Sequence, residues 1–368
     1  MSKARQLADL GNVYDDGALS HRNMVVNGAM QVAVRGDSTG INSGGLYGPD
    51  RMRYVRSGRS SLRTISQFAD GPDDFTNCYK IVCDAGAAPS ANDINWLEYR
   101  FEGQDVAHLN YGSSTAKTVT LSFWVKSNVT GVYTTRLQAF NASVTRMITQ
   151  GFTVSSADTW EYITVQFSGD ADYSFYTDNT EGLRIAWLLG GGSSRVSVGT
   201  DGSWIDYDGT KLGPNQTADV FATTNNYFQI TGVSLEVGDT ATPFEHRSYG
   251  DELARCQRYF YKHYKTQAYE NIGNASTYNT INTYLTYHHP VRMRANPTVT
   301  VSAASDFYIT GNASDLAATG FSVGHASPFC VQLNFGYASG ITNGYAYWIR
   351  MGSGGEDASK YLQADAEL

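Results

Sequence analysis

Apolar and polar residues alternate along most of this chain, in short stretches separated by clusters of turn-forming residues. In residues 227–237, for example, Phe228, Ile230 and Leu235 alternate with polar residues, and Gly232 interrupts the alternation. A period of two indicates a strand with one buried face, and the interrupting glycine is typical of a bulge. The same pattern predicts strands at residues 24–30, 61–68, 78–83, 96–101, 118–125, 133–140, 147–154, 162–167 and 183–189.

The pattern changes after residue 237. Gly238 to Pro243 ends the strand, because Gly238 accepts any backbone angle and Pro243 removes a hydrogen-bond donor. Asp251 stands where a helix cap belongs, and Leu253 and Cys256 follow at helical spacing, so we predict a connecting helix over residues 248–258. A second set of strands follows at residues 259–264, 280–287, 297–301, 307–310, 321–323, 331–335, 345–349 and 361–363.

The N-terminal residues 1–22 form a separate segment. Ala4, Leu7 and Leu10 lie on one side of a short predicted helix that Gly11 and Asn12 would end. A helix this short needs a partner surface, so the segment is either a frayed terminus or an anchor that orders on docking. The chain then divides into this segment, a first domain at residues 23–247, the connecting helix at residues 248–258, and a second domain at residues 259–368.

Composition supports an all-β protein with two β-sandwich domains, the second smaller than the first. The 368 residues are 41% hydrophobic and only 17% charged, with 37 glycines and 25 tyrosines, which suits short strands joined by tight turns. A net charge of −8 argues against binding to nucleic acid or to an anionic membrane, and no apolar run is long enough to insert into a bilayer. The four cysteines are scattered, and we expect them to be reduced residues of the core.

Three strings carry a family resemblance: NMVVNGAMQ at residues 23–31, KTVTLSFWVKS at residues 117–127, and TGVSLEVGDTATPFEHRSYGDELARCQRY at residues 231–259. In this order they resemble bacteriophage tail-fibre and virion appendage proteins, in which NGAMQ opens and LEVG...TPFE.R closes a carbohydrate-binding-like jelly-roll domain. The resemblance covers residues 23–260. The remainder is matched chiefly by PVRMRANPTVTV at residues 290–301 and by the ending ADAEL.

The resemblance implies a virion subunit made in the host bacterial cytoplasm. It implies a homotrimer whose N-terminal segment docks to another virion protein, such as a tail adaptor, nozzle or capsid protein. The implied activity is adhesion to host cell-surface polysaccharide. A closed trimer would let several weak sites act together.

Loop aromatics flanked by Asp or Asn are the candidate glycan contacts. A sugar ring packs its apolar face on Tyr or Trp, while amides and carboxylates bind its hydroxyls. The alternative for each aromatic is a place in the core or in a trimer interface. The candidates are Tyr173, Tyr176, Trp204 and Tyr207 in the first domain, and Tyr345 and Trp348 in the second.

Two charged groups have competing interpretations. Asp201, Asp206 and Asp208 could hold a structural calcium ion, although the segment lacks the alternation and closing glutamate of an EF-hand loop, so we favour solvated turn residues. The basic run could grip acidic sugars, but we favour a solvated edge strand or pairing with acidic residues of a neighbouring subunit. This run consists of Arg51, Arg53, Arg56, Arg59 and Arg63.

Catalysis has little support in the sequence, and we predict that the protein is not an enzyme. No nucleophile elbow, phosphate loop or zinc-protease string is present. A glycosidase needs only two carboxylates brought together by folding, for which Asp170, Asp172, Glu161, Glu181 and Asp206 are available. Two alternatives to an adhesin therefore remain: a structural capsid-decoration or tail cement protein, and a polysaccharide depolymerase.

Overall fold

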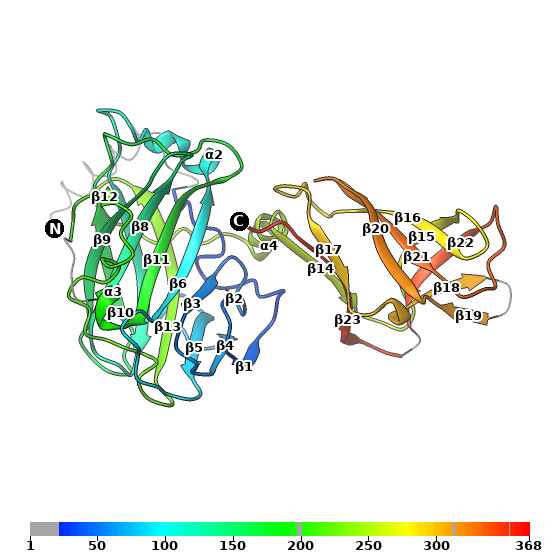
Figure 1. Cartoon of the computed structure of the whole chain (residues 1–368), viewed down its shortest axis with the longest axis horizontal. Coiled ribbons are helices and arrows are strands. Elements are labelled where there is room, and N and C mark those ends of the chain that lie inside the picture. The colour runs from blue at the N-terminus through cyan, green and yellow to red at the C-terminus, as the bar shows by residue number, and fades with distance from the viewer. Residues whose placement is uncertain (1–21, 197–200, 312–313, 353) are drawn as a thin grey trace. The chain divides into compact units, whose positions relative to one another are not determined.

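The computed structural model describes residues 22–196, 201–311, 314–352 and 354–368 (Figure 1). The chain forms two units. The first extends to Glu252 and also takes in Leu368, and the second runs from Leu253 to Glu367. Ala4, Leu7 and Leu10, the predicted anchoring residues, lie outside the described residues.

The first unit consists of two antiparallel sheets. The six-stranded sheet has the order β1 (Ser38–Ile41), β4 (Arg63–Phe68), β5 (Cys78–Cys83), β13 (Tyr227–Val237), β7 (Val119–Ser127), β10 (Glu161–Phe167). The seven-stranded sheet has the order β12 (Ile205–Asp206), β9 (Thr145–Val154), β8 (Gly131–Phe140), β11 (Glu181–Gly191), β6 (Ile94–Glu102), β3 (Arg53–Ser57), β2 (Gly45–Leu46). Three short helical turns, α2 (Gly103–Val106), η1 (Ala107–Leu109) and α3 (Ser193–Val196), lie in the connections.

The strand order confirms the predicted jelly roll. From β5 to β13 the chain passes from one sheet to the other at every connection except the β8–β9 hairpin and the connection from β11 to β12. The order β5-β13-β7-β10 in one sheet therefore faces β6-β11-β8-β9 in the other. This interleaving of two four-stranded sets is the jelly-roll arrangement.

The core lies between these two sheets and follows from the alternation in sequence. Phe123 on β7 and Trp187 on β11 are both fully buried, and their rings meet edge to face at 5.8 Å. Neighbouring residues on the same strands, such as Trp124, face outward and are only partly buried. Each large apolar side chain buried in this way contributes about 2–3 kcal/mol.

The second unit is also a sandwich, as predicted. Its three-stranded sheet has the order β14 (Phe260–Lys265), β23 (Asp357–Asp365), β17 (Thr298–Val301). Its seven-stranded sheet has the order β19 (Ser314–Ala317), β18 (Phe307–Gly311), β22 (Ala346–Met351), β15 (Glu270–Thr277), β16 (Asn282–His288), β21 (Cys330–Gly336), β20 (Gly320–Ala326), and the turn η2 (Ala304–Asp306) precedes β18. Val299 and Leu362 of the smaller sheet share one core with Leu285 and Ile349 of the larger.

The predicted opening strand at residues 24–30 is wrong, because this segment is a turn. Asn27 and Met30 both adopt positive φ angles, 62° and 54°, and the Met30 amide donates to the Asn27 carbonyl oxygen. Asparagine tolerates this backbone region better than most residues because its side chain can bond nearby backbone. The Asn27 side chain does so, donating to the carbonyl oxygens of Val32 (2.8 Å) and Asp50 (2.9 Å).

The interpretation of the arginine run as a solvated edge or intersubunit row is also wrong for Arg59 and Arg63, which are buried. Arg59 binds both carboxylate oxygens of Asp219, at 2.6 and 2.7 Å. Arg63 is completely buried, with its guanidinium 5.0 Å from the ring of Tyr54 and 5.1 Å from that of Phe221. A planar guanidinium group can stack on aromatic rings. Such stacking allows an arginine side chain, which is usually exposed to solvent, to be buried in the core.

Candidate functional site

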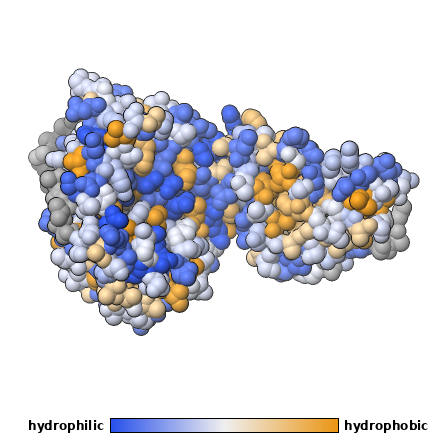
Figure 2. All heavy atoms as spheres, viewed as in Figure 1, coloured by the Kyte–Doolittle hydropathy of each residue, from blue (hydrophilic) through white to orange (hydrophobic). Residues whose placement is uncertain are grey.

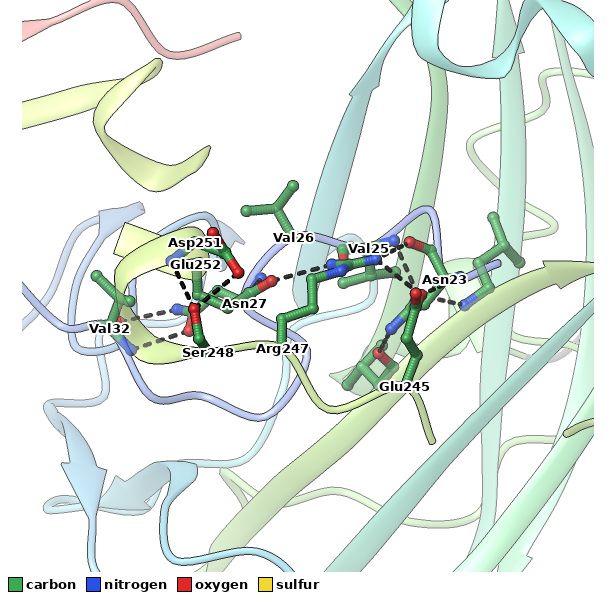
Figure 3. A network of polar contacts seen from close by, with 12 residues as sticks. Asn23, Val25, Val26, Asn27, Val32, Glu245, Arg247, Ser248, Asp251 and Glu252 are labelled. Carbon is green, nitrogen blue, oxygen red and sulfur yellow. Dashed lines mark hydrogen bonds and ion pairs between the residues drawn. The ribbon is translucent and has the colours of Figure 1, made fainter. Parts of the chain in front are cut away.

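The first and last of the strings that carry the resemblance, residues 23–31 and 231–259, meet in the first unit (Figure 3). Asn23 donates from its side-chain amide to the carbonyl oxygen of Val233 (3.0 Å) and accepts from the amides of Val25 (2.9 Å) and Leu235 (3.1 Å). Because Val233 and Leu235 lie on β13, this one side chain joins the start of the unit to its last strand.

Arg247 completes this connection from the other end. Its guanidinium donates to the carbonyl oxygen of Asn23 (2.5 Å) and to the carboxylates of Glu245 (3.2 Å) and Glu252 (3.0 Å), and Glu252 in turn accepts from the Asn27 amide. We call Asn23, Asn27, Glu245, Arg247 and Glu252 the clasp. Their side chains are committed to one another and to backbone, so the motif that carries the resemblance closes the fold.

The clasp also fixes the start of α4 (Tyr249–Gln257). The prediction of Asp251 as its cap is corrected: the Ser248 hydroxyl accepts from the Asp251 amide (3.2 Å) and donates to the Asp251 carboxylate (2.7 Å). Ser248 is therefore the N-cap and Asp251 its partner three residues later, a reciprocal capping pair.

Two candidate aromatics of the first unit have structural roles. The Tyr173 hydroxyl donates to Asn141 (2.5 Å) and accepts from the Val144 amide (2.8 Å), which joins the loop before β11 to the β8–β9 turn. The Trp204 indole donates to the Ser168 carbonyl oxygen (2.7 Å) and packs edge to face on Tyr111. Tyr176 and Tyr207 remain exposed.

The three candidate calcium ligands have separate partners. Asp206 pairs with Arg146 (3.1 Å), Asp208 caps Thr210 and pairs with Lys211 (3.3 Å), and Asp201 lies beside Thr149 and Gly151. The Thr210 hydrogen bonds lower the pKa of Asp208 to about 2. In the parts of the chain that the structure describes, no three His, Cys, Asp or Glu side chains lie close enough to hold a metal ion.

The second unit places Trp348 in the open, on the outer face of its seven-stranded sheet. Tyr347 and Ile349 on either side of it are buried in the core, whereas 59% of the Trp348 surface is exposed. Strand register sets Trp348 directly opposite Asn274 on β15 and Thr310 on β18. Directly opposed residues share a face and lie side by side, so an amide and a hydroxyl flank the indole.

A second aromatic group lies on the same face. Tyr284 on β16 stacks with Tyr278, with ring centroids 5.0 Å apart and 19° between the ring planes. Two strand spacings, about 10 Å, separate β16 from β22. Register also places Ser276, Asn334 and Ser322 in the row of Tyr284, and the Asn334 amide donates to Ser322 (3.4 Å). We call this surface the Trp348 face. Its members are Trp348, Asn274, Thr310, Tyr284, Tyr278, Ser276, Asn334 and Ser322.

The border of the Trp348 face carries the remaining candidate and an ion pair. Tyr345 precedes β22 and is exposed, and its carbonyl oxygen accepts from the Thr277 hydroxyl (3.1 Å). Arg350 follows Trp348 on the same face, binds Asp315, and lies 4.2 Å from the ring of Tyr269. Sequence reasoning missed Tyr284 and Asn334, which the alternation of apolar and polar residues in their strands could have placed together on an outer face.

Exposed aromatic side chains are not confined to this face. Figure 2 shows hydrophobic residues interspersed with hydrophilic ones on the visible surface of both units. Tyr162 and Phe68 of the first unit and Phe329 of the second are also exposed. What distinguishes Trp348 is its position within a strand, between two polar partners fixed by register. Within the described ranges, no helix has the length and apolar character needed to cross a bilayer.

No protein-family model and no curated protein matches the sequence. Among solved structures, the enzymatically active domain of bacteriophage CBA120 tailspike protein 4 is similar over 59% of this chain, with 11% identity and a TM-score of 0.31; this chain covers 22% of that one. A family 11 carbohydrate-binding module of a Clostridium thermocellum cellulosomal cellulase is similar over 58% of this chain and 98% of the module, with 11% identity and a TM-score of 0.29.

The CBM22-2 xylan-binding domain of Paenibacillus barcinonensis Xyn10C is similar over 50% of this chain and 91% of that domain, with 15% identity and a TM-score of 0.28.

Proposed function

We propose that this chain is a bacteriophage tail-fibre or virion appendage subunit that adheres to host cell-surface glycan through the Trp348 face. The observation that carries the proposal is the exposed indole of Trp348 between Asn274 and Thr310. An apolar sugar face laid on the indole would remove both from water, at about 25 cal/mol for each Å² buried. The flanking amide and hydroxyl would bind the sugar hydroxyls.

The shape of the face favours an extended glycan. Trp348 and the Tyr284–Tyr278 stack lie on different strands of one sheet. A ligand that touches both has to extend across β15, where Asn274 and Ser276 point outward and are exposed. A chain of several sugar rings satisfies this geometry, whereas a single ring would reach one aromatic group only.

The virion location and the assembly are parts of the same proposal and rest on the sequence resemblance. In it, residues 1–22 dock to another virion protein, and three copies of the chain associate. Three weak sites held on one particle raise avidity by orders of magnitude without any new contact. Light scattering checks the assembly: a monomer at micromolar concentration would contradict the trimer.

We further propose that the protein holds glycan without cleaving it. A glycosidase requires a carboxylic acid whose pKa is raised, so that it can donate a proton near neutral pH. Three carboxylates of the first unit are instead paired: Asp170 with Arg146 (2.9 Å), Glu181 with Arg184 (2.6 Å), and Glu98 with Arg100 (2.6 Å). Burial alone would raise the pKa of Glu98. The charges of Arg184 and Arg100 outweigh this effect, so the pKa of Glu98 lies below its ordinary value. Burial raises the pKa of Asp201, so Asp201→Asn is the variant that tests for a catalytic acid.

The experiment compares two variants of the full chain on an array of bacterial surface polysaccharides. Trp348→Ala should weaken binding at least about tenfold, or about 1.4 kcal/mol. Phe329→Ala is the matched control, because Phe329 has the same exposed fraction, 59%, but lies in the loop before β21. Binding to no glycan would favour a decoration or cement protein. Equal binding by both variants would contradict the role proposed for the Trp348 face. Release of reducing ends would favour a depolymerase.

A further inference from the structure

The outer face of the six-stranded sheet in the first unit carries a second aromatic strip. Register places Trp124 on β7 directly opposite Tyr162 on β10 and Thr231 on β13. The rings of Trp124 and Tyr162 are 5.2 Å apart, and 45% of the Tyr162 surface is exposed. The neighbours of Trp124 along the strand, Phe123 and Val125, point into the core, so the strip lies on the side of the sheet away from it.

Gly232 extends this strip. A Cβ atom at Gly232 would lie 2.8 Å from the ring of Phe75 and 3.0 Å from that of Trp124, so both rings pack against the bare backbone of the β13 bulge. Phe75 in turn meets Phe244 at 5.0 Å. The bulge that the sequence predicts therefore makes room for aromatic side chains from two separate segments of the chain, Phe75 and Trp124.

A polar group lies beside the aromatic strip. Lys126, two residues after Trp124 on the same face, donates to the Asp70 carboxylate (3.0 Å), and Gln229 donates to the same oxygen (2.9 Å). The Lys126 ammonium also lies 5.9 Å from the ring of Trp160. Burial would raise the pKa of Asp70, but the hydrogen bonds from Gln229 and Lys126 outweigh it and lower that pKa, so Asp70 is held ionised.

We infer that Tyr162, Trp124, Lys126 and Asp70 form a second saccharide-binding surface, in the first unit and separate from the Trp348 face, with the buried Gln229 holding the Asp70 carboxylate in place. The inference rests on the proposed function for the class of its ligand. Sugar hydroxyls both donate and accept, so one ligand can bind the Lys126 ammonium and the Asp70 carboxylate while its ring packs on Trp124 and Tyr162.

The polar group favours a sugar over a second copy of this chain. An ammonium has three donors and a carboxylate accepts about four hydrogen bonds, and within the described residues Lys126 and Asp70 use only part of this capacity. A flat protein surface would strip water from these groups without replacing each hydrogen bond, which is costly for charged groups. A small polyhydroxylated ligand, or bridging water, can satisfy them.

The test follows each tryptophan separately in the full chain. The sequence has six tryptophans, so 5-fluorotryptophan labelling gives six fluorine NMR signals that single Trp→Phe variants assign. The probes are soluble oligosaccharides of glucose, galactose and N-acetylglucosamine. We expect the Trp124 signal to shift saturably with at least one probe, and to do so equally in the Trp348→Ala variant.

Two substitutions and a control define the surface. Tyr162→Ala and Asp70→Asn should each raise the dissociation constant read from the Trp124 signal about tenfold. Phe68→Ala should change that constant less than about twofold. Phe68 is the matched control because it is exposed on the same sheet, with an exposed fraction of 41%. If Trp348 responds to sugar and Trp124 does not, the inference fails and the proposed function stands.

The converse results are equally informative. A response of Trp124 without one of Trp348 supports this surface and contradicts the role proposed for the Trp348 face. A Trp124 signal that changes with protein concentration instead of sugar assigns the strip to contact between copies and overturns the inference. Silence of both signals with every probe overturns both proposals.

Discussion

The guanidinium of Arg247 donates hydrogen bonds to the backbone carbonyl oxygens of Asn23, at 2.5 Å, and of Val25, at 3.2 Å, although more than 200 residues separate them in sequence. Arg247 also pairs with Glu245 and Glu252, and only 9% of its side chain is exposed. One side chain thus joins the first residues of the jelly roll to the segment that leaves it.

Replacement of Arg247 by alanine should therefore destabilise the first unit. Two carboxylates would lose their cation and two carbonyl oxygens a donor, and breaking a largely buried pair costs about 3 kcal/mol. Chemical denaturation of the full chain measures the loss. Lys211→Ala, which removes an exposed ion pair with Asp208, is the control and should cost less than about 1 kcal/mol. Equal losses would show that the clasp does not stabilise the fold.

Gly28, which follows Asn27 of the clasp, is predicted to tolerate no side chain. A Cβ atom there would lie 2.1 Å from the carbonyl oxygen of Val233, a backbone atom that cannot move aside easily. Gly28→Ala should cost about 2 kcal/mol or more of unfolding free energy. Gly250→Ala is the control: nothing lies within 4 Å of its Cβ position, and alanine favours helix α4 by up to about 1 kcal/mol. A thermal melt in which both variants lose stability alike would contradict this view.

Strand positions could be predicted from sequence where alternation is regular. β5 and β13 have the predicted bounds. The alternation around Ile81 in β5 is uninterrupted, and the alternation around Ile230 in β13 is broken by one bulge only. β15 was not predicted. Its buried residues Ile272 and Ala275 are three apart instead of two, since the register shifts between Asn271 and Gly273. A bulge near the middle of a short polar strand thus hides the period of two.

The sequence could predict that aromatic residues near Asp or Asn form the candidate site, but it could not predict which of these aromatic residues are exposed. Trp348 and Trp204 look alike in sequence, each near polar residues and glycines. Only the fold distinguishes them, because Trp348 lies on the outer face of a strand whereas Trp204 packs on Tyr111 beside the core. Likewise Arg63 could not be recognised as a core residue, because the rings that hold it, Tyr54 and Phe221, come from distant segments.

Stability of the first unit should depend on pH through Glu98. Burial raises its pKa, but Arg184 and Arg100 outweigh burial and lower the pKa from its ordinary value of 4.5. A lowered pKa means that the ionised form stabilises the fold, so this contribution is complete above about pH 4.5 and is lost as the pH falls through the folded-state pKa. Acid should therefore weaken the first unit.

Glu98→Gln isolates this contribution. At about pH 7 the variant should be less stable than the native chain by about 3 kcal/mol, because Arg100 and Arg184 lose a buried carboxylate. As the pH falls from about 4.5 through the folded-state pKa of Glu98, the two proteins should converge, since Glu98 becomes protonated. Denaturation curves at about pH 7 and along an acid series measure the difference. Glu356→Gln, at an exposed position, is the control, and a Glu98→Gln deficit that does not shrink in acid would contradict the assignment.

The same substitution at two asparagines should separate binding from stability. Asn274 is exposed beside Trp348, so Asn274→Ala should weaken glycan binding about fivefold, or about 1 kcal/mol for a lost hydrogen bond, without changing unfolding. Asn23 is buried with three backbone partners, so Asn23→Ala should cost about 3 kcal/mol of stability and leave affinity unchanged at temperatures where the variant is folded. Calorimetric unfolding and polysaccharide binding of each variant measure both quantities. Loss of the affinity read from the Trp348 fluorine signal in Asn23→Ala, or loss of stability in Asn274→Ala, would mean that the clasp and the Trp348 face are not independent.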